Sequence, residues 1–143
     1  MQKCLQQNYL IGNFVAEVES LELEYTSEKT ETQCTNMKAA KRLFDGNELL
    51  ARSLLARINA LKSADCIKDI IVQPMFHFHK LKNKNGRDLE GYFAIDVKSR
   101  KEPWRIIMQP LDENKNPYEP CNIDQISGIV KIVEITEVSK HYE

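Results

Sequence analysis

The sequence lacks the short motifs that mark several common kinds of active site. Its 143 residues contain no glycine-rich phosphate loop, no G-x-S-x-G nucleophile motif, no H-E-x-x-H zinc motif and no cluster of acidic metal ligands. We therefore expect neither a metal nor a cofactor, and the chemistry that the sequence leaves open is metal-free.

Cysteines are few and widely spaced. Cys4, Cys34, Cys66 and Cys121 form no C-x-x-C pair and have no closely spaced histidine, so neither a zinc cluster nor a redox motif is indicated. No apolar run approaches the roughly 18 residues of a membrane span, and the first residues contain no signal-peptide core. We expect buried or incidental thiols in a reduced, soluble, cytoplasmic protein that does not engage a membrane.

The charge is nearly balanced overall but unevenly distributed along the chain. The formal net charge is −1, yet residues 77–105 carry eight Lys or Arg against four Asp or Glu, whereas residues 106–143 carry three against seven. A protein that binds nucleic acid nonspecifically is usually basic throughout. The pattern therefore indicates either one anion-facing surface or a solvated charged rim.

The order of the hydrophobic patterns predicts an α+β fold. Alternation over residues 21–25 predicts a half-buried strand, and residues 27–44 are expected to be helical, with Ser27 as the N-cap. A break at residues 45–47 precedes a second helix. Its apolar stripe consists of Leu50, Leu54, Ile58 and Leu61. We expect these two helices to form a helical hairpin that packs on a sheet.

The second half of the chain is predicted to supply that sheet. We expect four strands in a largely antiparallel arrangement, with the helices on one face, at residues 76–81, 92–97, 104–109 and 129–137. Residues 110–125 are expected to be a loop. Residues 1–20 could hold a strand, a short helix or an extension, so we divide the chain into an N-terminal extension, 1–20, and a domain, 21–143.

The two-residue period of the strands sorts side chains between the two faces of the sheet. Trp104, Ile106 and Met108 share the core-facing side of their strand, so Arg105 points the other way, together with Tyr92 of the neighbouring strand. Arg105 would then emerge with Tyr92 on an uncovered face. The alternative is a cross-strand ion pair, for which Asp96 is the candidate partner.

Histidines supply the candidate acid–base groups. His77 and His79 share one phase of their strand and are expected to be exposed, whereas Phe76 and Phe78 are expected in the core. Histidine changes its charge near neutral pH, and nearby cations would stabilise the negative charge of a pentacoordinate phosphorane. The alternative is that both histidines are surface residues without a catalytic role.

Several segments, taken in order, resemble the RelE/HigB superfamily of toxins from bacterial type II toxin–antitoxin systems, and most of all its HigB "killer protein" branch. The segments are His79-Lys80-Leu81-Lys82, Gly91-Tyr92-Phe93-Ala94-Ile95, Trp104-Arg105-Ile106 and a near-terminal His141. The branch has H-P-L-K, G-Y-W-S-I, W-R-I and D-Y-H in this order. The resemblance covers about residues 21–143, with Lys80 in place of the proline and Ser139-Lys140 in place of Asp-Tyr.

The resemblance implies a RelE/ParE-like fold and a ribosome-dependent endoribonuclease, or mRNA interferase, in which the ribose 2′-OH attacks the adjacent phosphate without a metal. The implied partners are the ribosome, mRNA and a cognate antitoxin, expected to be a helix-turn-helix protein. The implied catalytic residues are His79, Lys82, Arg105 and His141. The implied RNA-binding residues are Lys80, Lys84, Arg87, Tyr92 and Tyr142, with Tyr92 either supporting the fold or stacking on a base.

Two alternatives remain at this point. One is a toxin of the ParE type, which inhibits a protein target such as gyrase and hydrolyses nothing. The other is a noncatalytic module that binds RNA or an antitoxin.

Overall fold

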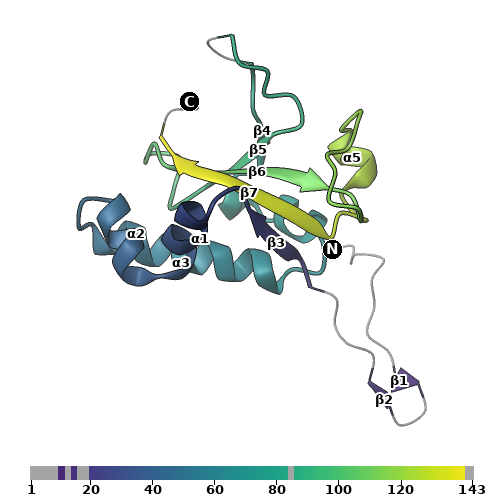
Figure 1. Ribbon diagram of the computed structural model, residues 1–143, viewed down its shortest axis with the longest axis horizontal. Helices are drawn as coiled ribbons and strands as arrows, with labels where there is room; N and C mark the ends of the chain where they lie inside the picture. Colours follow the sequence, from purple (N-terminus) through teal and green to yellow (C-terminus); the bar gives the residue numbers. More distant parts are fainter. Residues whose placement is uncertain (1–9, 12–13, 16–19, 84–85, 141–143) are drawn as a thin grey trace.

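A five-stranded mixed sheet with helices on one face forms the body of the protein (Figure 1). The computed structural model describes residues 10–11, 14–15, 20–83 and 86–140. The strands lie in the order β3-β7-β6-β5-β4, with β3 parallel to β7 and the other pairs antiparallel. Their bounds are Glu22–Tyr25 (β3), His79–Lys80 (β4), Phe93–Asp96 (β5), Arg105–Leu111 (β6) and Ile132–Ser139 (β7).

This sheet confirms the predicted α+β class but differs from the expected sheet. The expected sheet had four largely antiparallel strands, whereas the sheet has five strands and is mixed. The difference arises because β3 joins the sheet through parallel pairing with β7, in the register Glu22 to Ile132. Strands β1, Leu10–Ile11, and β2, Phe14–Val15, form a separate antiparallel pair. Of the conformations considered for residues 1–20, these four residues therefore adopt the strand.

The first predicted helix is two helices, α1 (Glu28–Thr35) and α2 (Met37–Leu43). Ser27 caps α1 as predicted, because its side chain accepts a hydrogen bond from the Thr30 amide. Asn36 breaks the run: its backbone is extended, and its side chain accepts a hydrogen bond from the Ala39 amide 3.0 Å away. An asparagine side chain can bond to the backbone at a helix start, and this bond favours a new helix over one continuous helix through the asparagine.

The next helix, α3 (Glu48–Ser63), lies where it was predicted. Asn47 caps it, and the stripe Leu50, Leu54, Ile58 and Leu61 is buried in the main core. The expected hairpin is therefore a group of three helices, α1 to α3, on one face of the sheet (Figure 1). Burial of this stripe against the sheet is the main apolar contact that holds the helical layer in place.

Three short helical segments fall where the sequence predicted none: α4 (Lys68–Ile71), η1 (Pro74–Phe76) and α5 (Ile123–Ile126). Helix α5 lies within the predicted loop, 110–125, and η1 takes the start of the predicted strand, 76–81. Only β4, two residues long, remains of that strand. No helix in the described part of the chain is long and apolar enough to cross a membrane.

Two apolar clusters lie on opposite faces of the sheet. The main core includes Phe93, Ile95, Ile106 and Met108, which confirms the predicted inward phase of β5 and β6. A second core, on the other face, consists of Leu81, Leu89, Ala94 and Ile107, with Tyr92 packed against it. Because Leu81 and Leu89 come from the connection between β4 and β5, this connection covers a face that was expected to be open.

The described cysteines match the prediction only in part. Cys34 is a buried free thiol and Cys121 a half-buried one. Burial raises the pKa of Cys34 to about 12, so its thiol stays protonated and inert near neutral pH. Cys66 is fully buried but disulfide-bonded, which the expected reduced state did not include. Cys4 lies outside the described residues.

The break at Asn36 generates a stability prediction. Substitution Asn36→Ala removes the acceptor for the Ala39 amide and should lower the free energy of unfolding by about 1 kcal/mol. Asn36→Asp keeps a capping oxygen and should leave stability within a few tenths of a kcal/mol of the native value. Urea denaturation of the three proteins measures both effects. Equal losses in the two variants would contradict the capping role.

Candidate functional site

A buried carboxylate, Asp96, lies at the end of β5 and organises the surrounding polar groups. Asp96 is 1% exposed. Its Oδ1 atom forms an ion pair with Nε of Arg105, at 3.2 Å, and accepts a hydrogen bond from Nδ1 of His77, at 3.0 Å. The strand register places Arg105 directly opposite Asp96. The alternative in which Arg105 forms a cross-strand ion pair is therefore the one that the structure confirms.

Arg105 is buried rather than exposed. It is 4% exposed, so the expectation that it emerges on an open face is wrong. Its guanidinium donates to carbonyl oxygens of the β5–β6 turn, namely those of Glu102, Trp104 (2.9 Å), Arg100 (3.3 Å) and Ser99 (3.5 Å). A planar guanidinium with several donors suits this task, because it satisfies many carbonyls of one turn at once. Arg105 therefore holds the β5–β6 turn around its guanidinium and balances the negative charge of Asp96.

A second arginine holds the same end of the sheet from the helical side. Arg57 of α3 donates from Nε to the carbonyl oxygens of Asp96 (3.2 Å) and Val97 (3.3 Å), and from Nη2 to those of Lys98 (3.2 Å) and Met75 (3.4 Å). Desolvation lowers the pKa of Arg57, and the charge of Asp96 opposes this shift. Because Met75 belongs to η1, Arg57 fastens the segment that leads into His77 to the end of β5.

His77 follows η1 in the left-handed backbone region, with φ 50°. This conformation is uncommon for residues other than glycine, asparagine and aspartate. It ends η1 and brings the imidazole to Asp96, and the histidine side chain is 26% exposed. An ionised carboxylate only accepts hydrogen bonds, so Nδ1 carries the proton, and Nε2 lies at the opposite edge of the ring.

His79, in β4, stacks on His77. The ring centroids are 4.4 Å apart and the planes differ by 28°. Nδ1 of His79 donates to the carbonyl oxygen of His77 at 2.7 Å, which makes Nε2 the lone-pair nitrogen when this ring is neutral. The sequence analysis expected both histidines to be exposed on one phase of a regular strand, whereas both are half-buried and a bend at His77 brings the rings together. We call His77, His79, Asp96 and Arg105 the histidine site.

Cationic side chains follow the histidine site along the chain. Lys80, Lys82 and Arg87 are exposed, and Lys80 Nζ lies 3.6 Å from a carboxylate oxygen of Glu90. These three residues lie on β4 and in the connection after it, and their exposure fits both an anion-facing surface and a solvated charged rim. Three other predicted site residues, Lys84, His141 and Tyr142, lie outside the described residues.

Tyr92 belongs to the second core and is only half-buried. It packs against the cluster that includes Leu81 and Leu89, and its backbone amide donates to the Leu89 carbonyl at 3.1 Å. Tyr92 thus contributes its side chain to the second core. Its other predicted role, stacking on a base, stays a prediction.

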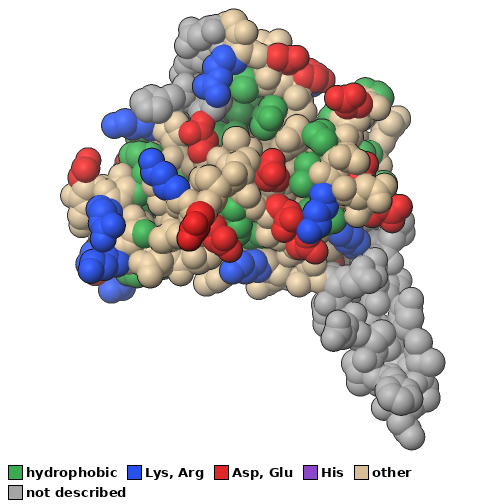
Figure 2. All heavy atoms as spheres, in the orientation of Figure 1, with side chains coloured by type: hydrophobic (Ala, Val, Ile, Leu, Met, Phe, Trp, Pro, Cys, Tyr) green, Lys and Arg blue, Asp and Glu red, His purple; other side chains and the backbone are tan. Residues whose placement is uncertain are grey.

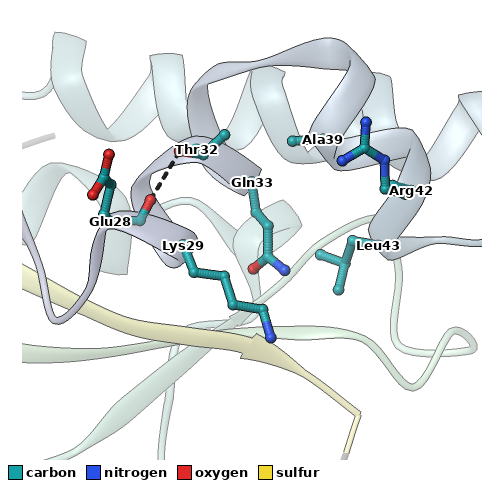
Figure 3. Close-up of a pocket in the computed structure, with 7 residues that line it drawn as sticks. All are labelled: Glu28, Lys29, Thr32, Gln33, Ala39, Arg42 and Leu43. Carbon is teal, nitrogen blue, oxygen red and sulfur yellow. Dashed lines mark hydrogen bonds between the residues drawn. The ribbon is translucent and has the colours of Figure 1, made fainter.

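Two hollows of the described surface lie away from the histidines. One, of about 500 Å³, lies between α1 and α2 and includes Lys29, Gln33, Arg42 and Leu43 in its wall (Figure 3). A second, of about 440 Å³, shares three of these residues and continues to Trp104 and Ser139. Neither is lined by a histidine. We place the candidate acid–base chemistry at the histidine site instead, because two imidazole rings stack there beside a buried carboxylate.

Acidic side chains gather on a different surface from the histidines. On the face shown in Figure 2, Asp and Glu side chains lie over β3 and β7, and no histidine is visible among the described residues. Lys115 Nζ lies 2.8 Å from a Glu24 oxygen and 3.3 Å from a Glu22 oxygen there. Hydrogen bonds to these two carboxylates raise the pKa of Lys115.

Sequence reasoning missed the connection between His77 and Asp96. It placed His77 on the exposed phase and considered Asp96 only as a partner of Arg105. The available signal was weak: an aspartate at the end of an otherwise apolar strand, opposite an arginine. Such a carboxylate needs hydrogen-bond donors when it is buried, and a histidine ring nitrogen is one kind of donor.

Comparisons with known proteins give this chain no relatives. It matches no protein-family model, no curated protein and no solved structure. In the described part of the chain, no group of three or more His, Cys, Asp or Glu side chains is placed to hold a metal ion.

The enclosed ion pair generates a second stability prediction. Asp96→Asn leaves the buried guanidinium of Arg105 without its counter-charge and should lower the free energy of unfolding by about 3 to 5 kcal/mol. The matched control is Glu90→Gln, which removes one charge from an exposed pair and should change stability by less than about 1 kcal/mol. Urea denaturation measures both. Similar losses for the two variants would show that the burial of the pair does not matter.

Proposed function

We propose that this protein is an mRNA-cleaving toxin of a toxin–antitoxin pair, a ribosome-dependent endoribonuclease that uses 2′-OH attack without a metal. The observation that carries the proposal is the stacked pair of histidines followed by exposed cations. The ordered segments that resemble the HigB branch supply the substrate and the antitoxin partner. The proposal has the chain in the cytoplasm, and a helix-turn-helix protein as its cognate antitoxin.

The reaction needs two proton transfers at one phosphate. A base removes the proton of the ribose 2′-hydroxyl while the O2′–P bond forms, and an acid protonates O5′ while the P–O5′ bond breaks. The products are a 2′,3′-cyclic phosphate and a 5′-hydroxyl. His79 suits the base because its Nδ1 donates to a carbonyl oxygen, so that Nε2 carries the lone pair in the neutral ring.

Cations next to the histidines would stabilise the extra negative charge of the phosphorane. Lys82 is exposed, two residues beyond the end of β4, and we assign it this role, with Lys80 and Arg87 binding the RNA backbone. Arg105 receives a different role from the one that the resemblance implies. Its guanidinium is engaged by Asp96 and the β5–β6 turn, so we assign it to positioning the site rather than to contacting phosphate.

Cleavage of mRNA on programmed ribosomes tests the proposal. The native chain should produce fragments with a cyclic phosphate and a 5′-hydroxyl, and His79→Ala should cut at least about 100-fold more slowly. Lys82→Met should slow cutting by about tenfold or more, because it removes a charge that faces the phosphate. The matched control is Lys62→Met, which removes an equally exposed charge from the end of α3 and should cut like the native chain.

Other results would favour the alternatives. Inhibition of DNA supercoiling by gyrase without any RNA cleavage would favour a ParE-like toxin. RNA binding that survives His79→Ala, again without cleavage, would favour a noncatalytic RNA-binding module. Undiminished cleavage by both His79→Ala and Lys82→Met would refute the assignment of these residues.

A further inference from the structure

We propose that His77, oriented by Asp96, is the general acid that protonates the leaving 5′-oxygen. This inference rests on the proposed function and adds to it a catalytic residue outside the segments that carry the family resemblance. It also gives the two histidines different tasks, with His79 as the base and His77 as the acid.

The partners of the two rings differ in the way that these tasks require. Nδ1 of His79 donates to a neutral carbonyl oxygen, whereas Nδ1 of His77 donates to a carboxylate. A ring that protonates O5′ must carry protons on both nitrogens, and this imidazolium forms an ion pair with Asp96 at 3.0 Å. After the transfer His77 is neutral, Nδ1–H still faces Asp96, and Nε2 has lost its proton to O5′.

Asp96 can hold His77 in a fixed place because the carboxylate is itself fixed. Arg105 Nε forms an ion pair with the same oxygen that accepts the hydrogen bond from His77, and Asp96 is 1% exposed. Arg57 binds the carbonyl oxygens of both Asp96 and Met75, so the backbone on each side of this hydrogen bond is tied to α3. Asp96, Arg105 and Arg57 are therefore positioning residues in this proposal.

Stacking brings the two rings to one phosphate. With centroids 4.4 Å apart, the two rings are close enough to act on the entering and leaving oxygens of the same phosphate. Two fully charged rings at this distance would repel each other, whereas one neutral base beside one charged acid would not. The stack is thus suited to unequal roles.

The left-handed backbone at His77 permits substitutions that keep the backbone conformation and remove only the imidazole ring. Asparagine tolerates φ 50° and can donate its side-chain amide to Asp96 in place of Nδ1, yet it has no atom equivalent to Nε2. His77→Asn should therefore fold with native stability, as checked by urea denaturation, and lose only the proton donor. His77→Gly also fits this backbone and leaves a space for free imidazole.

The decisive experiment compares two leaving groups. After the cut site of the native chain has been mapped on a programmed ribosome, an mRNA is prepared with sulfur replacing the bridging 5′-oxygen at that site. A thiolate leaves without protonation, so His77→Asn should slow cleavage of the normal RNA at least about 100-fold but cleave the sulfur-linked RNA at nearly the native rate. His79→Ala should be slow on both.

Free imidazole provides an independent test. It should restore cleavage of the normal RNA by His77→Gly, in proportion to its concentration, and should not affect Asp45→Gly, a control at another left-handed position between α2 and α3. The proposal is overturned if His77→Asn cuts the normal RNA like the native chain, or if it is equally slow on both substrates. A native chain that cuts neither RNA overturns the proposed function and this inference together, whereas the first two results overturn this inference alone.

Discussion

The buried carboxylate of Asp96 is the constraint on which the arrangement of this end of the sheet depends. Moving a carboxylate out of water costs several kcal/mol unless charged and hydrogen-bonding partners replace the lost hydration. Arg105 and His77 supply these partners. Arg105 comes from β6 and His77 from the turn after η1. The contacts that satisfy the charge of Asp96 therefore fix these two segments relative to β5. The turn over Arg105 and the bend at His77 follow from this requirement.

The sequence predicted well whatever depends on the local period of side chains. The pleat of a strand places alternate residues on opposite faces, so Phe93 and Ile106 could be assigned to the main core in advance. The stripe on α3 and the cap at Ser27 follow from equally local rules. Even the partnership of Asp96 with Arg105 was accessible as one of two alternatives, because neighbouring strands bring such residues opposite each other.

Features that depend on competition or on distant contacts could not be predicted in this way. The pattern around Asn36 fits one long helix as well as two capped ones, and only the energies of the alternatives decide between them. The left-handed turn at His77 depends on Asp96, nineteen residues further along the chain. The cover over Ala94 and Ile107 comes from Leu81 and Leu89, which do not form a regular element whose period could be recognised.

The parallel pairing of β3 with β7 has a consequence for the time at which the fold can form. β7 is hydrogen-bonded to β3 on one side and to β6 on the other, and Glu22 meets Ile132 across most of the chain. Contacts between such distant residues form late and slow the folding of a domain. During synthesis, β3 and the helices after it must therefore wait without their neighbouring strand until residues 132–139 have left the ribosome.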